Sequence, residues 1–300
     1  MTTQAPGHDA ASNSRRSGIA PQTDGERWAQ EILRELRRAR WRPAAWARLL
    51  AESFDRARHT SLARPGLSRQ ARRWSLLGAG SATGLTTWAS GRGLGGWQPV
   101  GACGWALGCG AMLEWHIGMV EAPGERCART GEDRLGLADA LSYARLVCAP
   151  VMLASHGSRS RFLGLLAGGA VTDVLDGPLA RARGATRLGG TLDPAADVAF
   201  IVAAAMAAGR SGWLSGPAVA AVGAREASVF LGSAVYYITR AEGPPAQAAG
   251  VTRFAGPPLV LGLALAAVGR RRLASSVVIA AAAVASARQL VALTISARAV

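Results

Sequence analysis

The chain has 300 residues, which is enough for one or two domains, and half of these residues are hydrophobic. Its mean hydropathy is +0.17 although residues 1–70 are strongly polar, so the remainder is more apolar than a soluble domain and indicates the bilayer. The net charge of +15 comes from 34 basic residues that are all arginine. Beside so many apolar segments, this charge favours an anionic membrane face over nucleic acid as the partner.

The N-terminal quarter of the chain is polar and basic. Residues 1–24 are rich in Ser, Gly, Gln and Thr without an apolar core, which predicts a disordered tail and no secretory signal. Residues 25–73 predict a basic amphipathic helical region, in which apolar and basic residues fall on different faces: Trp28, Ile32, Leu33 and Leu36, against Arg34, Arg37, Arg38 and Arg40. Two interpretations stay open: this region lies on lipid headgroups, or it packs against a partner or neighbouring helix.

Eight apolar segments follow, and each has about the length that crosses a hydrocarbon core. They lie near residues 74–91, 97–120, 138–156, 162–179, 189–209, 213–238, 254–269 and 274–296. A short Gly-rich turn joins the first two, which predicts a transmembrane hairpin over 74–120, followed by a cytoplasmic linker over 121–135. Small residues fill the segments, as expected where membrane helices pack closely. The fold class predicted is therefore all-α, a polytopic membrane helical bundle.

The arginines also predict an orientation. Eight crossings place both termini on one side, and the arginine-rich N-terminal region marks that side as cytoplasmic. Further arginines lie in loops that this orientation places in the cytoplasm: Arg126, Arg129, Arg134, Arg181, Arg183, Arg187, Arg240 and Arg253. Residues 270–272 are three arginines in a loop predicted to be external, but the N-terminal bias usually decides. We expect a multi-pass protein of the cell inner (plasma) membrane.

Four aspartates form the most informative pattern in the chain. Asp173 and Asp176 are three residues apart, and Asp193 and Asp197 are four apart, so each pair lies on one face of a helix. Each pair is at the end of an apolar segment, and the arginine-rich loop 181–187 separates the two. Because the chain leaves the membrane and returns between them, we expect all four carboxylates to meet at one membrane boundary, facing the cytoplasm.

Four converging carboxylates indicate metal binding. They repel one another unless they are neutralised, and two divalent cations would balance them. Mg²⁺ and Mn²⁺ prefer carboxylate oxygens, and two such ions are the usual clamp for in-line displacement at phosphorus. The alternative is that the aspartates pair with arginines or cap helices, and Asp193-Pro194 has the form of an N-cap followed by proline.

Neighbouring residues suit a nucleotide. Gly177 and Ala180 leave a helix face without bulk, and Gly189 does the same on the returning segment, so a flat nucleotide could approach the backbone. Arg181 extends from the helix end, where it could meet a phosphate.

The stretch resembles the signature of the CDP-alcohol phosphatidyltransferases, D-x2-D-G-x2-A-R-x8-G-x3-D-x3-D. The matching residues are Asp173, Asp176, Gly177, Ala180, Arg181, Gly189, Asp193 and Asp197. One departure is that seven residues, not eight, separate Arg181 from Gly189, in the loop. Weaker similarity covers residues 138–146, which resemble the start of the family's first core helix, and the pair Arg225-Glu226 in its fourth.

The resemblance implies a six-helix membrane domain, here over residues 136–298, that is usually a homodimer and opens to the cytoplasmic leaflet. It implies that Asp173, Asp176 and Asp193 bind two Mg²⁺ or Mn²⁺ ions, while Asp197 is the general base and also a metal ligand. With Asp173, the residues Gly177, Ala180, Arg181 and Gly189 would bind the nucleotide. The reaction implied is transfer of a phosphatidyl group from a CDP-linked donor, CDP-diacylglycerol, to an alcohol acceptor with release of CMP, in phospholipid biosynthesis.

Other charged residues lie within apolar segments. Arg225 either binds an anionic acceptor or forms a structural pair with Glu226, and the two interpretations stay open. Glu114 and His116 fit an interfacial belt around Trp115 better than a substrate path. Two other functions are also weighed: a catalytically silent membrane scaffold of the same fold, and a metal-dependent hydrolase of CDP-lipids.

Overall fold

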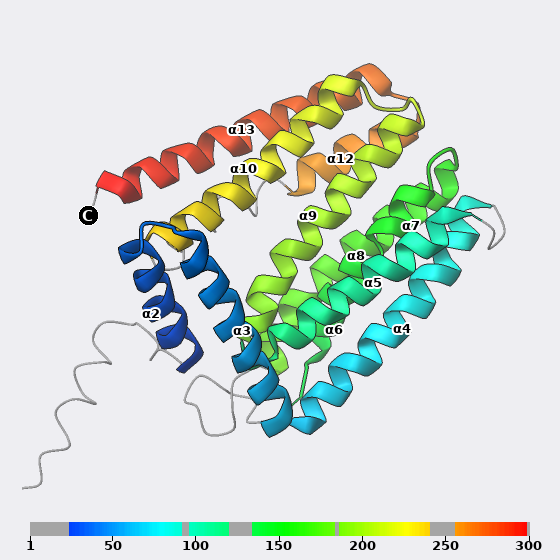
Figure 1. The fold of residues 1–300 in the computed structure, drawn as a ribbon. Coiled ribbons are helices and arrows are strands. Elements are labelled where there is room, and N and C mark those ends of the chain that lie inside the picture. The colour runs from blue at the N-terminus through cyan, green and yellow to red at the C-terminus, as the bar shows by residue number, and fades with distance from the viewer. Residues whose placement is uncertain (1–23, 92–95, 120–133, 184–185, 241–255, 299–300) are drawn as a thin grey trace, which may run out of the picture.

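The computed structural model describes residues 24–91, 96–119, 134–183, 186–240 and 256–298, all helices and short connections without a strand (Figure 1). The helices are α2 (Asp24–Arg38), α3 (Pro43–Ala63), α4 (Pro65–Ser90), α5 (Trp97–Trp115), the 3₁₀ turn η1 (Ile117–Met119), α6 (Leu137–Val147), α7 (Ala149–Ala154), α8 (Arg159–Arg183), α9 (Arg187–Arg210), α10 (Gly216–Arg240), α12 (Gly256–Ala267) and α13 (Arg271–Arg298). The predicted all-α membrane bundle is confirmed. Nearly all of the predicted tail 1–24 and linker 121–135 lies outside the described residues.

Among the described residues, four stretches are long and apolar enough to cross a membrane. They are Leu137–Ala154, which joins α6 and α7, Arg159–Leu179 in α8, Leu188–Arg210 in α9 and Gly216–Arg240 in α10, and they match four predicted segments. The helix α12 is apolar but shorter, and α4 and α5 are not among the four. Spanning by α4, α5, α12 and α13 stays a prediction.

Small residues hold the core together. The largest cluster joins α7, α8, α9, α10, α12 and α13, and most of its buried side chains are alanines around a few large ones such as Phe162, Leu214 and Leu263. One close approach lies near the aspartates, where a Cβ added to Gly169 of α8 would stand 2.5 Å from the Phe200 ring of α9. This glycine therefore lets α8 and α9 approach within one helical turn of Asp173 and Asp197.

The predicted N-terminal hairpin forms as a helix pair. The helices α4 and α5 pack along each other, and their shared apolar cluster extends to Tyr143 and Val147 of α6. One end of the helix bundle contains the first residues of α4, α6 and α9 and the last residues of α5 and α8. We call this the aspartate end, because α8 and α9 carry the aspartates there (Figure 1).

The basic region 25–73 folds into α2, α3 and the start of α4, and its first helix packs on the protein. Leu33 and Leu36 are buried in a small cluster with Ala45 and Leu49 of α3 and Ile238 of α10. For α2, packing against neighbouring helices is therefore the correct interpretation of the amphipathic pattern.

Candidate active site

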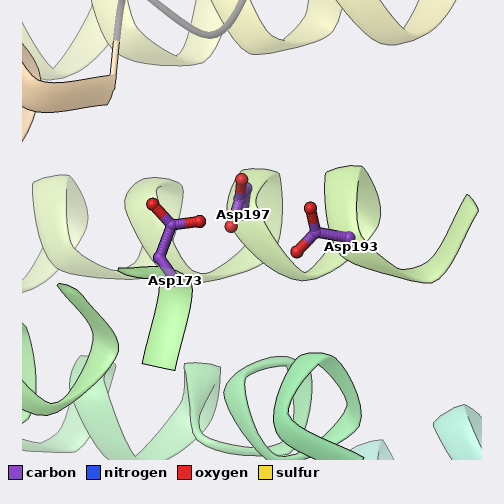
Figure 2. A group of neighbouring side chains, drawn as sticks. All are labelled: Asp173, Asp193 and Asp197. Carbon is purple, nitrogen blue, oxygen red and sulfur yellow. The ribbon is translucent and has the colours of Figure 1, made fainter. Parts of the chain in front are cut away.

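The four aspartates do converge at the aspartate end. One carboxylate oxygen from each of Asp173, Asp193 and Asp197 lies within 4.8 Å of the others, in a group formed by α8 and α9 (Figure 2). The side chains of these three are 58%, 40% and 47% exposed, so the protein does not enclose them. Asp176 is outside this group and its side chain is only 12% exposed.

The start of α9 differs from one of the sequence interpretations. The helix begins at Arg187, capped by the Thr186 Oγ1 atom, which accepts a hydrogen bond from the Gly189 amide at 2.9 Å. Asp193-Pro194 therefore lies inside α9 rather than at its N-cap, and the capping explanation of Asp193 is wrong. Since proline has no amide hydrogen, Pro194 interrupts the hydrogen-bond ladder of α9 beside Asp193.

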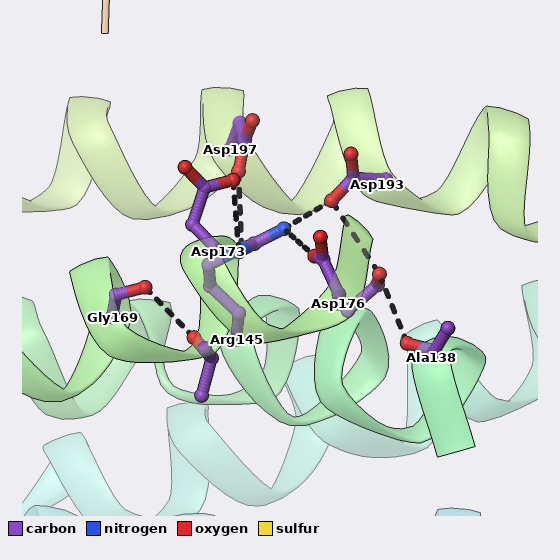
Figure 3. Close-up of polar contacts among 9 residues, drawn as sticks. Ala138, Arg145, Gly169, Asp173, Asp176, Asp193 and Asp197 are labelled. Carbon is purple, nitrogen blue, oxygen red and sulfur yellow. Dashed lines mark hydrogen bonds and ion pairs between the residues drawn. The ribbon is translucent and has the colours of Figure 1, made fainter. Parts of the chain in front are cut away.

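A buried arginine joins the four acids. The Arg145 side chain of α6 is 2% exposed, and its guanidinium reaches Asp173 at 3.4 Å, Asp176 at 3.2 Å and Asp197 at 3.0 Å, and also contacts Asp193 (Figure 3). The Nε atom of Arg145 is buried without a hydrogen bond, so its contact with Asp197 is an ion pair of poor alignment. Four carboxyl groups share this one guanidinium, so the cluster holds more acidic groups than Arg145 can neutralise.

The arrangement fits a divalent cation. Carboxylate oxygens are the donors that Mg²⁺ and Mn²⁺ prefer, and three of them already lie close together and are not enclosed by the protein. The charge that Arg145 leaves uncompensated is of the sign that a cation neutralises. An acidic cluster that could hold a metal is therefore present where the spacing of the aspartates predicts it.

Gly189 has a packing role. A Cβ at this position would stand 2.6 Å from the Asp139 Oδ1 atom of α6, and 3.1 Å from the Thr186 Oγ1 atom. Asp139 is 2% exposed and accepts hydrogen bonds from the Thr186 hydroxyl at 2.7 Å and the Gly136 amide at 2.8 Å. Gly189 thus allows the first turn of α9 to close against α6, besides any nucleotide that it would admit.

The remaining nucleotide residues are placed less fully. Gly177 follows Asp176 on α8 and is partly exposed. The backbone of Ala180 and Arg181 continues α8, and their side chains lie outside the described part of the chain.

Arg225 does not join the aspartates in the described residues. It is buried on α10 and pairs with Glu226, which matches the structural interpretation of that pair. It also lines a cavity of about 450 Å³ between α10 and α13. A role for Arg225 in acceptor binding stays a prediction.

Sequence reasoning gave no role to Asp139 or Arg145. Both lie in the stretch 138–146 that resembles the first core helix of the family, and an arginine inside an apolar segment was itself a signal, because such a charge is costly without partners. Glu114 has a simpler explanation, since it accepts hydrogen bonds from Arg72 at 2.7 Å and Ser68 at 2.8 Å.

Comparison with known proteins covers the same region. The model of the CDP-alcohol phosphatidyltransferase family matches residues 135–294, more than half of the chain. A search of curated proteins and a search of solved structures each found no match. The matched residues include Arg145, the four aspartates and most of the predicted domain 136–298, while residues 1–134 precede the match. The chain therefore belongs to the CDP-alcohol phosphatidyltransferase family, whose members are membrane transferases.

Proposed function

We propose that the chain transfers a phosphatidyl group from CDP-diacylglycerol to an alcohol and releases CMP, in phospholipid biosynthesis. The observation that carries this proposal is the convergence of four aspartates around Arg145 within the region that the family model matches. In the reaction, the alcohol oxygen forms a bond to the donor phosphorus that bears the diacylglycerol. The bond from that phosphorus to the bridging oxygen breaks, and CMP leaves with this oxygen.

Asp173, Asp176, Asp193 and Asp197 would hold two Mg²⁺ or Mn²⁺ ions. When bound, the ions neutralise the pyrophosphate and make its phosphorus easier to attack. Three of these side chains are at least 40% exposed, so they face the space that a donor must enter. Asp176 is nearly buried and contacts Arg145, so it would add charge from behind the other three.

Asp197 would act as the general base, taking the proton of the acceptor hydroxyl as the new bond to phosphorus forms. Its carboxylate is 3.0 Å from the Arg145 Nε atom and 47% exposed, so one side is held by the protein and the other is open. Arg145 would be a positioning residue, because it contacts all four acids from the protein side.

Gly177, Ala180 and Gly189 would line the nucleotide site with Asp173, and Arg181 would meet the phosphates. The aspartate end would face the cytoplasm, as the arginine-rich N-terminal region favours, with the protein in the inner (plasma) membrane. The enzyme would work as a homodimer, which the family resemblance implies.

The test is CMP release by the purified full chain with CDP-diacylglycerol and Mg²⁺ or Mn²⁺. The alcohols are glycerol 3-phosphate, phosphatidylglycerol, an inositol phosphate and serine, each supplied alone. We expect metal-dependent release with one alcohol. Asp197→Asn should lose it, and Glu31→Gln, an exposed acid on α2, should keep it. Release without any alcohol would indicate a hydrolase, and no release with any alcohol would favour a silent scaffold.

A further inference from the structure

The helix α3 exposes large apolar side chains. Trp46, Leu50 and Phe54, which we call the α3 apolar face, are 37%, 54% and 60% exposed. They follow one another at intervals of four residues and so lie on one side of the helix. No residue of α3 is buried. Three exposed large side chains in a row are unusual on a surface that meets only water, and they mark an interaction site.

The other two sides of α3 already have their environments. Ala45 and Leu49 pack on α2, and the turn of 300° between Trp46 and Leu49 places this contact beside the apolar face. Arg48 pairs with Glu35 at 3.2 Å and with Glu52 at 2.6 Å, on a polar side that is exposed. The helix thus has a protein side, a water side and an apolar side. The apolar side stays largely exposed, although Trp46 contacts the Trp41 ring and Phe54 contacts the Trp115 ring.

The apolar face lies beside the helices of the N-terminal hairpin. Phe54 meets the Trp115 ring edge-on at 5.9 Å, and the Trp115 Nε1 atom donates to the Ser53 Oγ atom at 2.8 Å. Trp115 is the last residue of α5, and α3 leads into α4 through Arg64 alone. In Figure 1, α3 crosses the aspartate end instead of running along the bundle. The apolar face is therefore next to the boundary at which a membrane around α4 and α5 would end.

The charges around this face suit an anionic surface. Residues 42–64 contain five arginines against two acids. Arg42 and Arg58 lie near the two edges of the apolar face and are both exposed. Trp and Phe on one side of a helix, with arginines beside them, are the composition of helices that lie in the headgroup region of anionic membranes.

We propose that α3 lies in the plane of an anionic lipid leaflet, with Trp46, Leu50 and Phe54 inserted among the acyl chains and Arg42 and Arg58 on lipid phosphates. The occupant of the face is the bilayer that surrounds the protein, and not a second copy or another protein. Because Arg37 of α2 donates to the Thr239 carbonyl of α10 at 2.5 Å, the lipid-bound helix pair also holds the end of α10.

The test uses the full chain in lipid nanodiscs, with the four native cysteines replaced by alanine. A nitroxide is attached to Leu50→Cys, Phe54→Cys or the control Asp55→Cys, whose side chain is 67% exposed and points away from the apolar face. We measure collisions of each label with oxygen, which concentrates in lipid, and with a nickel chelate, which stays in water. The discs contain phosphatidylcholine with or without phosphatidylglycerol.

In discs with phosphatidylglycerol, the ratio of oxygen collisions to nickel collisions should be several-fold higher for labels at 50 and 54 than for the label at 55. Nickel collisions equal to those at 55 would overturn the proposal. Low collisions with both reagents would also overturn it, since they would indicate a protein partner or a second copy. Removing phosphatidylglycerol should raise nickel collisions at 50 and 54, and unchanged values would refute the preference for an anionic leaflet. A second measurement needs no label and therefore cannot be disturbed by one. Brominated lipids should quench the Trp fluorescence of the unchanged chain more strongly than that of Trp46→Phe.

Discussion

Replacing Arg145 with glutamine removes a positive charge that contacts all four aspartates. Without metal, the acids would then face one another with no guanidinium between them, so the folded state should lose free energy of unfolding. Glutamine keeps part of the volume and can still donate hydrogen bonds, so the change in stability reports mainly the charge.

The expected loss of free energy of unfolding in Arg145→Gln follows from how exposed each ion pair is. Arg145 and Asp176 are 2% and 12% exposed, and removing one partner of a buried pair costs about 3–5 kcal/mol. The pairs with Asp173, Asp193 and Asp197 are open to water on the acid side and contribute about 0–1 kcal/mol each. Loss of Arg145 also leaves buried space, but water can enter from the exposed side. We therefore expect a loss of at least about 3 kcal/mol, which lowers the melting temperature by roughly 6 °C or more.

The assay is thermal unfolding of the purified chain in detergent with a chelator, and again with Mg²⁺. Arg72→Gln is the matched control, because Arg72 is 67% exposed and pairs with Glu114 at the surface, so its loss should lower the melting temperature much less than the loss of Arg145. Mg²⁺ should raise the melting temperature of Arg145→Gln more than that of the unchanged chain, since it supplies the missing positive charge. Equal melting of Arg145→Gln and Arg72→Gln in chelator would refute this account of Arg145.

Three further predictions concern the same region. Gly189→Ala should lower the free energy of unfolding by about 1–3 kcal/mol, because the added Cβ meets the hydrogen-bonded Asp139. Gly190→Ala is the control and should not destabilise the protein, because its Cβ would have no atom within 4 Å. Denaturant titration of both variants tests this difference. Gly169→Ala should destabilise by a similar amount against Phe200, while Gly168→Ala, which meets open space, should melt at or above the temperature of the unchanged chain. Asp193→Asn should raise the Mg²⁺ concentration for half-maximal CMP release by about tenfold or more, and an unchanged Mg²⁺ titration would exclude Asp193 as a ligand.

The meeting of the aspartates was predictable because it depends on local spacing and on the apolar segments. Asp173 and Asp176 share a helix face at their spacing, as do Asp193 and Asp197, and a chain that turns at the membrane boundary must return beside itself. Both facts can be read along a single stretch of sequence. The structure accordingly shows the carboxylates together at the aspartate end.

The features that escaped prediction depend on contacts between distant segments. Arg145 is 28 residues from Asp173 and 48 from Asp193, and nothing in their spacing shows that α6 inserts its side chain between α8 and α9. The predicted helix start at Asp193 was wrong for a similar reason. Asp193-Pro194 has the local form of a helix start, but Thr186 caps the helix earlier and donates to the buried Asp139 of α6.

In the amphipathic region 25–73, too, the sequence does not show which distant segments come into contact. Its sequence predicts an apolar side on each helix but not what covers that side. Leu33 and Leu36 of α2 are buried against α3 and α10, whereas Leu50 and Phe54 of α3 stay exposed. Only the tertiary arrangement separates a helix that packs on the protein from one that is free to meet lipid.

The central claim is that the aspartate cluster transfers a phosphatidyl group to an alcohol. The most direct measurement is mass spectrometry of the lipid product formed from CDP-diacylglycerol, Mg²⁺ and the active alcohol in ¹⁸O-labelled water. We predict a phosphodiester that carries the alcohol and no ¹⁸O, formed by the unchanged chain and lost in Asp197→Asn. Phosphatidic acid containing ¹⁸O as the main product, or the same phosphodiester formed equally by Asp197→Asn, would contradict the account.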